Sequence, residues 1–516
     1  MSGRIYTGAD VPDDLTPSCD VCVVGSGAGG AVLAHALVER GLSVVLLEEG
    51  GHHTRAAFQG REDLAYPALY QELANRATDD LSINILQGRS VGGGTTVNWC
   101  TSFRAPPRIL EHWQRAYGVQ GLSEAALAPH FDWIEQRLGI HEWPLERINR
   151  NNRILWEGCG ALGYERKLLR RNVRDCGDLG YCGMGCPTDA KQSMHVTLIP
   201  EAVRAGLTVF ANASARRLET RGSRVSAVHA ELLDPATDRP TGKRLTVRAK
   251  VTAVACGAIN SPALLLRSEL TGGGRVGLRT MLHPVVVSAA EFEEPVQAFY
   301  GAPQSVFSPH FLDRGPDRLG FFIETPPVHP VLASMVLPGH GGDHQALMQK
   351  LPFTQVLIAL TVDGLVAGDE GGSVGLRGGG ARRLTIDYPL KPMNWEAFLA
   401  AQKAMARIQF AAGARSVTSL HANPVVMRSP ADVDLLDRAP WEKLRVRVVT
   451  AHQMGGCAMG SDPRTSVVDS RLRYHSLDNL FVVDGSVFPT ALGINPQETI
   501  FGLARWGADH VAQAVS

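Results

Sequence analysis

The hydrophobic pattern near the N-terminus predicts a strand, a helix and a second strand in close succession. Residues 20–24 form a short, mainly apolar run that starts at Asp20, as in a parallel strand that is buried on both faces. Residues 31–40 are mainly apolar helix formers and end at Gly41, which suits a helix C-terminus. Residues 43–47 form a second buried run that ends at Glu48. This segment therefore predicts a βαβ unit of a parallel sheet.

Similar patterns occur later in the chain. Residues 479–483 form another buried run, and Pro496 suits the first turn of a helix that continues to His510. The alternating segments 355–363 and 383–388 predict strands of an antiparallel sheet. One group of large apolar residues either lines an apolar pocket or belongs to the core: Phe299, Phe307, Phe321, Phe322 and Ile323.

The loop between the first strand and the first helix reads G-x-G-x-x-G. Gly25 permits the tight turn, Gly27 lets the backbone approach a pyrophosphate, and Gly30 lets helix and strand pack closely. Ala28, in the same loop, precedes a helix whose N-terminus offers N–H groups and partial positive charge to phosphates. Glu48 stands where a carboxylate binds ribose hydroxyls. This context predicts a dinucleotide, and it suits FAD and NAD equally.

A second glycine-rich loop covers residues 88–98. Gly92, Gly93 and Gly94 are followed by Thr95 and a second threonine, which suggests backbone lying flat against a ligand with N–H and hydroxyl donors. The loop is flanked by residues that prefer burial, so we expect it inside the protein rather than on a mobile surface: Val91, Val97 and Trp99.

The two loops together resemble the glucose–methanol–choline (GMC) oxidoreductase family. Residues 257–268 are similar to that family's second signature up to Ser268, and they are followed by a departure at residues 269–271. Residues 277–284 resemble the segment that comes next in the family. The resemblance implies a Rossmann-like FAD-binding domain and oxidoreductase chemistry.

By the same resemblance, Glu48 holds the adenosine ribose of FAD, and the first glycine loop holds its pyrophosphate. The second loop would run beside the isoalloxazine, with four residues as cofactor contacts: Gly92, Gly94, Thr95 and Asn98. Some family members tether the flavin through a histidine near this loop. Residues 88–104 contain no histidine, so we predict non-covalent FAD.

The C-terminal segment carries the candidate catalytic chemistry. Oxidation of an alcohol needs a group that accepts the hydroxyl proton and a polar group that holds the alcohol oxygen. His452 and Asn495 occupy the positions of the family's catalytic pair, in the His/Asn form that cholesterol oxidases have. Asp484 and Gly485 resemble the family segment that faces the ribityl and pyrophosphate groups, although Asp484 also suits a turn or helix cap.

A cluster of three cysteines is the least usual feature: Cys176, Cys182 and Cys186. It resembles a stretch of bacterial GMC members near the long-chain alcohol oxidases. The plain interpretation is a structural loop with buried thiols and no metal. A zinc site lacks a fourth ligand at the usual spacing. A three-cysteine iron–sulfur cluster remains a further alternative, and it would favour a dehydrogenase over an oxidase.

The order of these motifs predicts a discontinuous FAD-binding domain in an α/β protein. It would comprise residues 15–105, 190–290 and 440–516, with a substrate-binding α+β domain, built on an antiparallel sheet, from residues 106–189 and 291–440. Lys+Arg and Asp+Glu are 51 each, so no strong field attracts nucleic acid or an anionic membrane. The sequence shows neither a signal peptide nor a stretch apolar enough to span a membrane, and we expect a cytoplasmic protein.

The sequence thus predicts FAD-dependent oxidation of an alcohol, with an apolar primary or secondary alcohol favoured by the resemblance. Electrons would pass on to oxygen, a quinone or a cytochrome. The alternative is a non-redox enzyme on the same scaffold, such as a hydroxynitrile lyase or a fatty-acid photodecarboxylase.

Overall fold

Strand β2 (Ser18–Val24) lies inside the first of two large sheets. The computed structural model describes residues 3–378 and 383–515. Val21, Cys22 and Val23 of β2 are fully buried between β3 (Val44–Leu47) and β12 (Pro240–Val254), which confirms the predicted parallel pair. The sheet has the order β1-β9-β3-β2-β12-β11-β10, and β24 pairs with β12. Its other strands are β1 (Arg4–Tyr6), β9 (Thr208–Phe210), β10 (Ala213–Arg221), β11 (Arg224–Leu233) and β24 (Leu480–Val482).

Helix α1 (Ala28–Glu39) follows β2 and packs against α11 (Gln497–Gln513) and α6 (Leu198–Arg204). It begins three residues earlier than the sequence pattern predicted, directly after Gly27. Close packing at its N-terminus depends on glycine. A Cβ at Gly30 would lie 1.9 Å from the carbonyl oxygen of Gly25, and one at Gly29 would lie 1.8 Å from that of Val483. The backbones of three segments therefore meet here without side chains between them.

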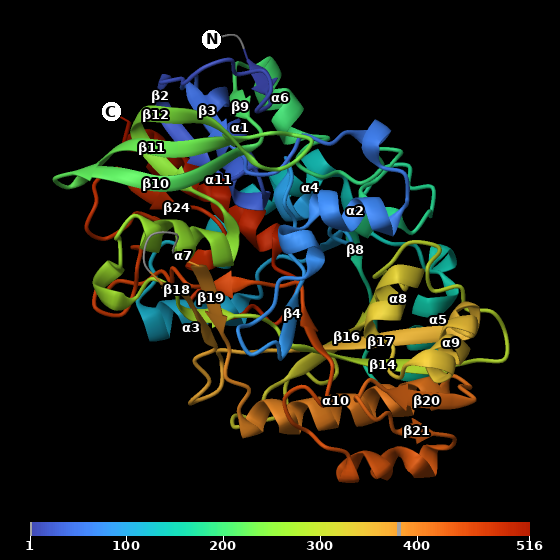
Figure 1. Cartoon of the computed structure of the whole chain (residues 1–516). Coiled ribbons are helices and arrows are strands. Elements are labelled where there is room, and N and C mark those ends of the chain that lie inside the picture. Colours follow the sequence, from blue (N-terminus) through green and yellow to red (C-terminus); the bar gives the residue numbers. More distant parts are fainter. Residues whose placement is uncertain (1–2, 379–382, 516) are drawn as a thin grey trace.

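The second sheet is mainly antiparallel and lies below the first in Figure 1. Its path is β21-β20-β14-β17-β16-β15-β7; β22 also pairs with β14, and β4 pairs with β22. The strands are β4 (Ile83–Ile85), β7 (Lys167–Leu168), β14 (Val285–Glu291), β15 (Val306–Ser308), β16 (Phe321–Glu324), β17 (Thr354–Thr361), β20 (Ser416–Ser419), β21 (Val426–Met427) and β22 (Val448–Thr450).

The two faces of this second sheet have different neighbours. Helices α10 (Pro392–Ala411) and α5 (Arg150–Ala161) cover one face, where Val286, Leu357 and Ala359 join a core with residues of α10. The alternate residues of β14 and β17 point to the opposite face. That face forms a wall of a large cavity, described below.

The predicted strands at 355–363 and 383–388 belong to different sheets. The first corresponds to β17, whereas β19 (Arg383–Asp387) pairs with β18 (Gly372–Arg377) in a smaller sheet that also contains β13 (Leu278–Met281) and β23 (Met454–Gly455). The predicted domain boundaries stay a prediction. Segments from all three predicted FAD ranges enter the second sheet, as β4, β14 and β22.

The remaining helices join and cover these sheets: α2 (Glu62–Leu69), α3 (Pro107–Tyr117), α4 (Glu124–Leu138), α7 (Gly257–Arg267), α8 (Pro330–Val336) and α9 (Gly341–Gln349). Across the described ranges 3–378 and 383–515, none of the helices has the length and apolar character needed to cross a membrane.

The packing of α1 gives a first prediction. Gly30→Ala places a Cβ against the Gly25 carbonyl, and such overpacking lowers the free energy of unfolding by about 1–3 kcal/mol. Urea unfolding of the FAD-free protein measures this loss. Gly342→Ala in α9 is the control, because a Cβ there meets no atom within 4 Å. Equal stability of the two variants would contradict the proposed close contact.

Candidate active site

A cavity of about 590 Å³ lies between the carboxyl edge of the first sheet and the open face of the second. Val24, Leu47 and Ala255, at the ends of β2, β3 and β12, form part of one wall. Crevices at the carboxyl ends of parallel strands are where ligands bind in folds of this type. Most of the predicted site residues line this one cavity: Gly25, Gly27, Ala28, Glu48, Gly94, Thr95, Asn98, His452, Asp484, Gly485 and Asn495.

The first glycine loop and the N-terminus of α1 form one end of the cavity. Gly25, Gly27 and Ala28 line it, whereas Gly30 lies behind them in the helix–strand contact. Glu48 is 7% exposed. Its carboxylate accepts hydrogen bonds from the backbone N–H and hydroxyl of Ser26 at 3.0 and 2.6 Å. Burial raises the pKa of this carboxyl.

Asp484 supports the same end of the cavity from the C-terminal part of the chain. Its Oδ2 accepts hydrogen bonds from the Gly257 N–H at 2.8 Å and the Ser261 hydroxyl at 2.5 Å, and its Oδ1 accepts one from the Ser486 N–H. Burial raises the pKa of Asp484. The carboxylate thus ties the end of β24 to the start of α7, with Gly485 beside it in the cavity wall.

The second glycine loop packs directly on the first. The Gly92 N–H donates to the Ser26 hydroxyl at 3.0 Å, and a Cβ at Gly93 would lie 2.6 Å from the Cα of Gly27. Gly92 itself stands behind the cavity wall, but a Cβ at Gly94 would meet no atom within 4 Å. Backbone N–H groups can donate to phosphates, and buried carboxylates can accept from ribose hydroxyls. Gly94 leaves room for a ligand to approach the backbone. This part of the cavity therefore suits a dinucleotide.

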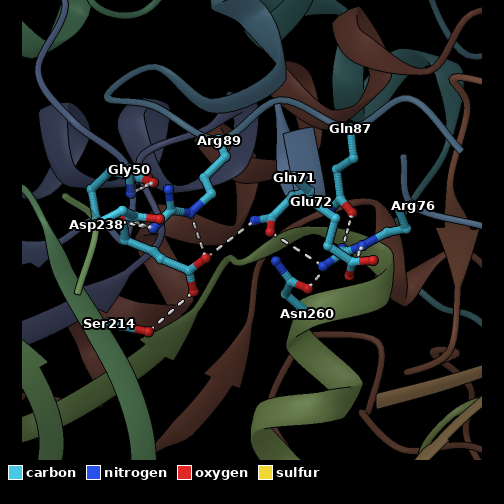
Figure 2. Close-up of polar contacts among 11 residues, drawn as sticks. Gly50, Gln71, Glu72, Arg76, Gln87, Arg89, Ser214, Asp238 and Asn260 are labelled. Carbon is cyan, nitrogen blue, oxygen red and sulfur yellow. Dashed lines mark hydrogen bonds and ion pairs between the residues drawn. The ribbon is translucent and has the colours of Figure 1, made fainter. Parts of the chain in front are cut away.

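Figure 2 shows a polar network at this end that the sequence analysis missed. Glu49 accepts hydrogen bonds from Arg89 Nε at 2.8 Å and from Gln71 Nε2 at 3.5 Å. Arg76, only 5% exposed, donates to Gln71 and to Gln87, and also to Asn260 and Glu72. The network fastens residues 71–89 to the end of β3 and lines part of the cavity. No motif marks it, because its members meet only in the folded chain.

His452 and Asn495 lie at another part of the cavity wall. His452 Nδ1 is 3.3 Å from Nδ1 of His283, so one ring donates and the other accepts. Burial lowers the pKa of His452 to about 4, and His452 is therefore neutral near pH 7. Burial, with a smaller contribution from His452, also lowers the pKa of His283. The pairing of these two rings was not predicted, although His283 falls within the family-like segment 277–284.

Asn495 has an acidic neighbour that sequence reasoning also missed. The Asn495 amide N–H donates to Oε2 of Glu324 at 3.4 Å, and Gln304 donates to the same oxygen at 2.7 Å. Glu324 is fully buried, and burial raises its pKa to about 8. Gln304 in turn accepts a hydrogen bond from Thr101 at 2.8 Å. Asn98, in the second glycine loop, donates to the side chain of Gln497 at 2.5 Å, two residues after Asn495.

The rest of the cavity is an apolar channel, formed by the open face of the second sheet and by α8. Its lining comprises alternate residues of two paired strands and one face of a helix: Val285, Val287, Ala289, Val356, Ile358, Leu360, Leu332, Ala333, Val336 and Leu337. The large apolar residues at positions 299, 307 and 321–323 do not line it, and most of them are buried in the core.

The three clustered cysteines do not converge on one point. Within the described ranges, no group of three or more His, Cys, Asp or Glu side chains is arranged to hold a metal ion. Cys182 instead lies near Cys100, which follows the second glycine loop, because Lys191 Nζ donates to the carbonyl oxygens of both Asn98 and Cys182. Cys186 Sγ lies 3.4 Å from the Thr188 hydroxyl.

Residues 22–285 and 369–504 match the two GMC oxidoreductase family models. A GMC-type oxidoreductase of Mycobacterium tuberculosis is 32% identical over 99% of this chain and 78% of its own length. A long-chain-alcohol oxidase of Arabidopsis thaliana is 29% identical over 97% of this chain and 69% of its own length.

Solved structures share the fold. Pyridoxine 4-oxidase from Mesorbium loti superposes with a TM-score of 0.69 at 22% identity, over 95% of this chain and 99% of that one. A formate oxidase of Aspergillus oryzae RIB40, in a study of FAD modification, superposes with a TM-score of 0.72 at 14% identity, over 97% of this chain and 99% of that one. The chain therefore belongs to the GMC oxidoreductase family, and its cofactor is FAD.

Proposed function

We propose that this flavoprotein oxidises a long-chain apolar alcohol to the corresponding carbonyl compound. The observation that carries the proposal is one cavity in which His452 and Asn495 share the wall with the apolar channel. An oxidoreductase role follows from the family, and the named long-chain-alcohol oxidases among the relatives support the substrate class. Bound FAD supplies the acceptor for the two electrons and the hydrogen that leave the alcohol carbon.

His452 is the proposed acceptor of the hydroxyl proton. Because its pKa is about 4, the ring carries no proton charge near pH 7 and has a lone pair available. When His452 donates its Nδ1–H to His283, that lone pair is on Nε2. In this tautomer His283 accepts from His452 and holds the orientation of its ring.

Asn495 is the proposed group that holds the alcohol oxygen. Glu324 accepts one Nδ2–H of Asn495 and so fixes the orientation of the amide, while the second Nδ2–H has no hydrogen-bond partner among the described residues and can donate to the alcohol oxygen. The amide therefore keeps polar capacity for a substrate. Holding the hydroxyl oxygen in one place sets the direction of its C–H bond, which is the orientation that this chemistry needs.

Replacing His452 tests the catalytic assignment. We expect His452→Ala to keep its FAD and to reduce the rate of anaerobic flavin reduction by a long-chain alcohol about 10²–10⁴-fold, because general base catalysis is lost. Stopped-flow absorbance measures that rate. His141→Ala, at an exposed histidine, is the control and should react like the parent. A near-parental rate in His452→Ala would refute the role of His452, and no reduction of the parent by any alcohol would favour a non-redox reaction.

From the apolar channel we predict how kcat/KM depends on the chain length of the alcohol. Each buried methylene contributes about 0.8 kcal/mol, so kcat/KM should rise roughly fourfold per added CH₂ until the channel is full. Val356→Thr, which places a hydroxyl in the channel, should lower this slope and leave short alcohols unaffected.

Val417→Thr provides the matched control, since Val417 is equally apolar and buried but does not line the cavity. It should keep the parental slope. A flat dependence on chain length in the parent would show that the channel does not bind the alkyl chain.

We also propose that FAD is held without a covalent bond, because residues 88–104 contain no histidine to carry one. Acid precipitation should leave the yellow colour in the supernatant. Colour that stays in the washed pellet would contradict this. Mixing the reduced protein with oxygen, a quinone or a cytochrome then identifies the electron acceptor.

A further inference from the structure

The cysteine-rich segment has no part in the proposed reaction, but one of its thiols has an unusual setting. Cys182 lies in a short 3-10 turn, Tyr181–Met184, close to Cys100. The Asn172 N–H donates to the carbonyl oxygen of Cys100 at 3.3 Å, and the guanidinium of the adjacent Arg171 reaches Sγ of Cys182. Cys100 is fully buried, whereas Cys182 is partly exposed. The two residues come from segments 82 positions apart, and Cys100 follows directly on the second glycine loop.

Two buried cations stand beside this pair. Arg171 is 0% exposed, and its Nη2 lies 3.8 Å from Sγ of Cys182. Lys191 is 1% exposed, and its Nζ donates to the backbone carbonyls of Thr96, Asn98 and Cys182 at 2.5, 3.0 and 2.7 Å. Arg171 otherwise donates to the backbone carbonyls of Pro303 and Gln304.

These cations need an anion, because unpaired buried charges are strongly unfavourable. In the part of the chain that the structure describes, neither Arg171 nor Lys191 has a carboxylate within 4.0 Å, the salt-bridge distance. A Cys182 thiolate, with Nη2 of Arg171 3.8 Å from its sulfur, supplies that anion. The hydrogen bond from Cys100, and then Arg171 and Lys191, lower the pKa of Cys182 to about 5 against the opposing effect of burial.

We propose that Cys182 and Cys100 form a redox-sensitive thiolate–thiol pair that hydrogen peroxide converts into a disulfide. The Cys182 thiolate attacks one peroxide oxygen, an S–O bond forms as the O–O bond breaks, and hydroxide leaves. The Cys100 thiol then attacks the sulfur of Cys182, and the S–S bond forms as the S–O bond breaks. The Cys100 proton and the two hydroxides, with one proton from solvent, give two waters. Two thiols lose two electrons and peroxide gains them.

The neighbouring cysteines differ from this pair. Burial raises the pKa of Cys176 to about 11, which leaves its thiol protonated and a poor nucleophile. Cys186 contacts Thr188 and accepts a hydrogen bond from the backbone N–H of Lys191 at 3.5 Å. Cys182 and Cys100 are thus distinguished from the other cysteines by the nearby Arg171 and Lys191 and by their proximity in the folded chain. The spacing of the cysteine motif does not identify them.

Thiol counting on the FAD-loaded protein tests the proposal. After reduction and removal of the reductant, the denatured chain should show nine free thiols, its full number of cysteines. After brief exposure to a small excess of hydrogen peroxide, the count should fall by two. Peptide mapping should find a disulfide between Cys100 and Cys182, and a thiol reductant should restore the original count. Because the peroxide is added, the result does not depend on alcohol oxidation.

Serine variants separate the role of Cys182, which attacks the peroxide, from that of Cys100, which then forms the disulfide. Cys100→Ser should stop at a sulfenic acid on Cys182, trapped by dimedone, and Cys182→Ser should leave Cys100 unoxidised. Cys176→Ser is the matched control and should lose two thiols like the parent, with an unchanged flavin spectrum confirming its fold. An unchanged count in the parent, a disulfide through Cys176 or Cys186, or iron that co-purifies and is lost in Cys182→Ser would each overturn the proposal.

Discussion

The site depends on a backbone contact that excludes side chains. At the N-terminus of α1, Gly29 lies against Val483 and Gly30 against Gly25, and Gly93 approaches Gly27 from the second glycine loop. In each case a Cβ would come within 2.6 Å of a backbone atom. Segments that are far apart in sequence can therefore meet only because glycine stands at these points. This contact places Glu48, Asp484 and the loop of residues 92–98 around one cavity.

The second sheet completes the site through strand alternation. In β14 and β17, one set of residues packs against α10 and the alternate set faces the cavity. The same strands thus stabilise the fold and provide the apolar channel. Two buried hydrogen-bond networks lie beside that channel. In one, His283 pairs with His452, and in the other, Glu324 accepts from both Gln304 and Asn495. Glu324 stands at the end of β16, and His283 lies just before β14, so the packing of this sheet helps to position both networks.

Local features were predicted well from the sequence. The βαβ unit follows from mainly apolar runs and a glycine loop, so its strands are found close to where the pattern placed them. Family-like motifs marked His452 and Asn495, which line the same cavity. Partners that are far apart in the sequence were not predicted. No motif or residue spacing indicates that His283 contacts His452 or that Glu324 contacts Asn495. The aromatic segment at 321–323 was ambiguous for a similar reason, since apolar character does not distinguish the core from a cavity wall.

Cys100 shows the same limit most clearly, and it also links the proposed thiol pair to the cavity. Its partner Cys182 lies in a motif, but Cys100 carries no motif of its own. Asn98, two residues earlier, donates through its side chain to Gln497, which lines the cavity close to Asn495, while the carbonyl oxygen of Asn98 accepts from Lys191. Lys191 in turn depends on the Cys182 thiolate for charge balance. Loss of that thiolate would leave Lys191 with only neutral carbonyls as partners, so oxidation of the proposed pair would act electrostatically on the loop of residues 92–98 that borders the cavity.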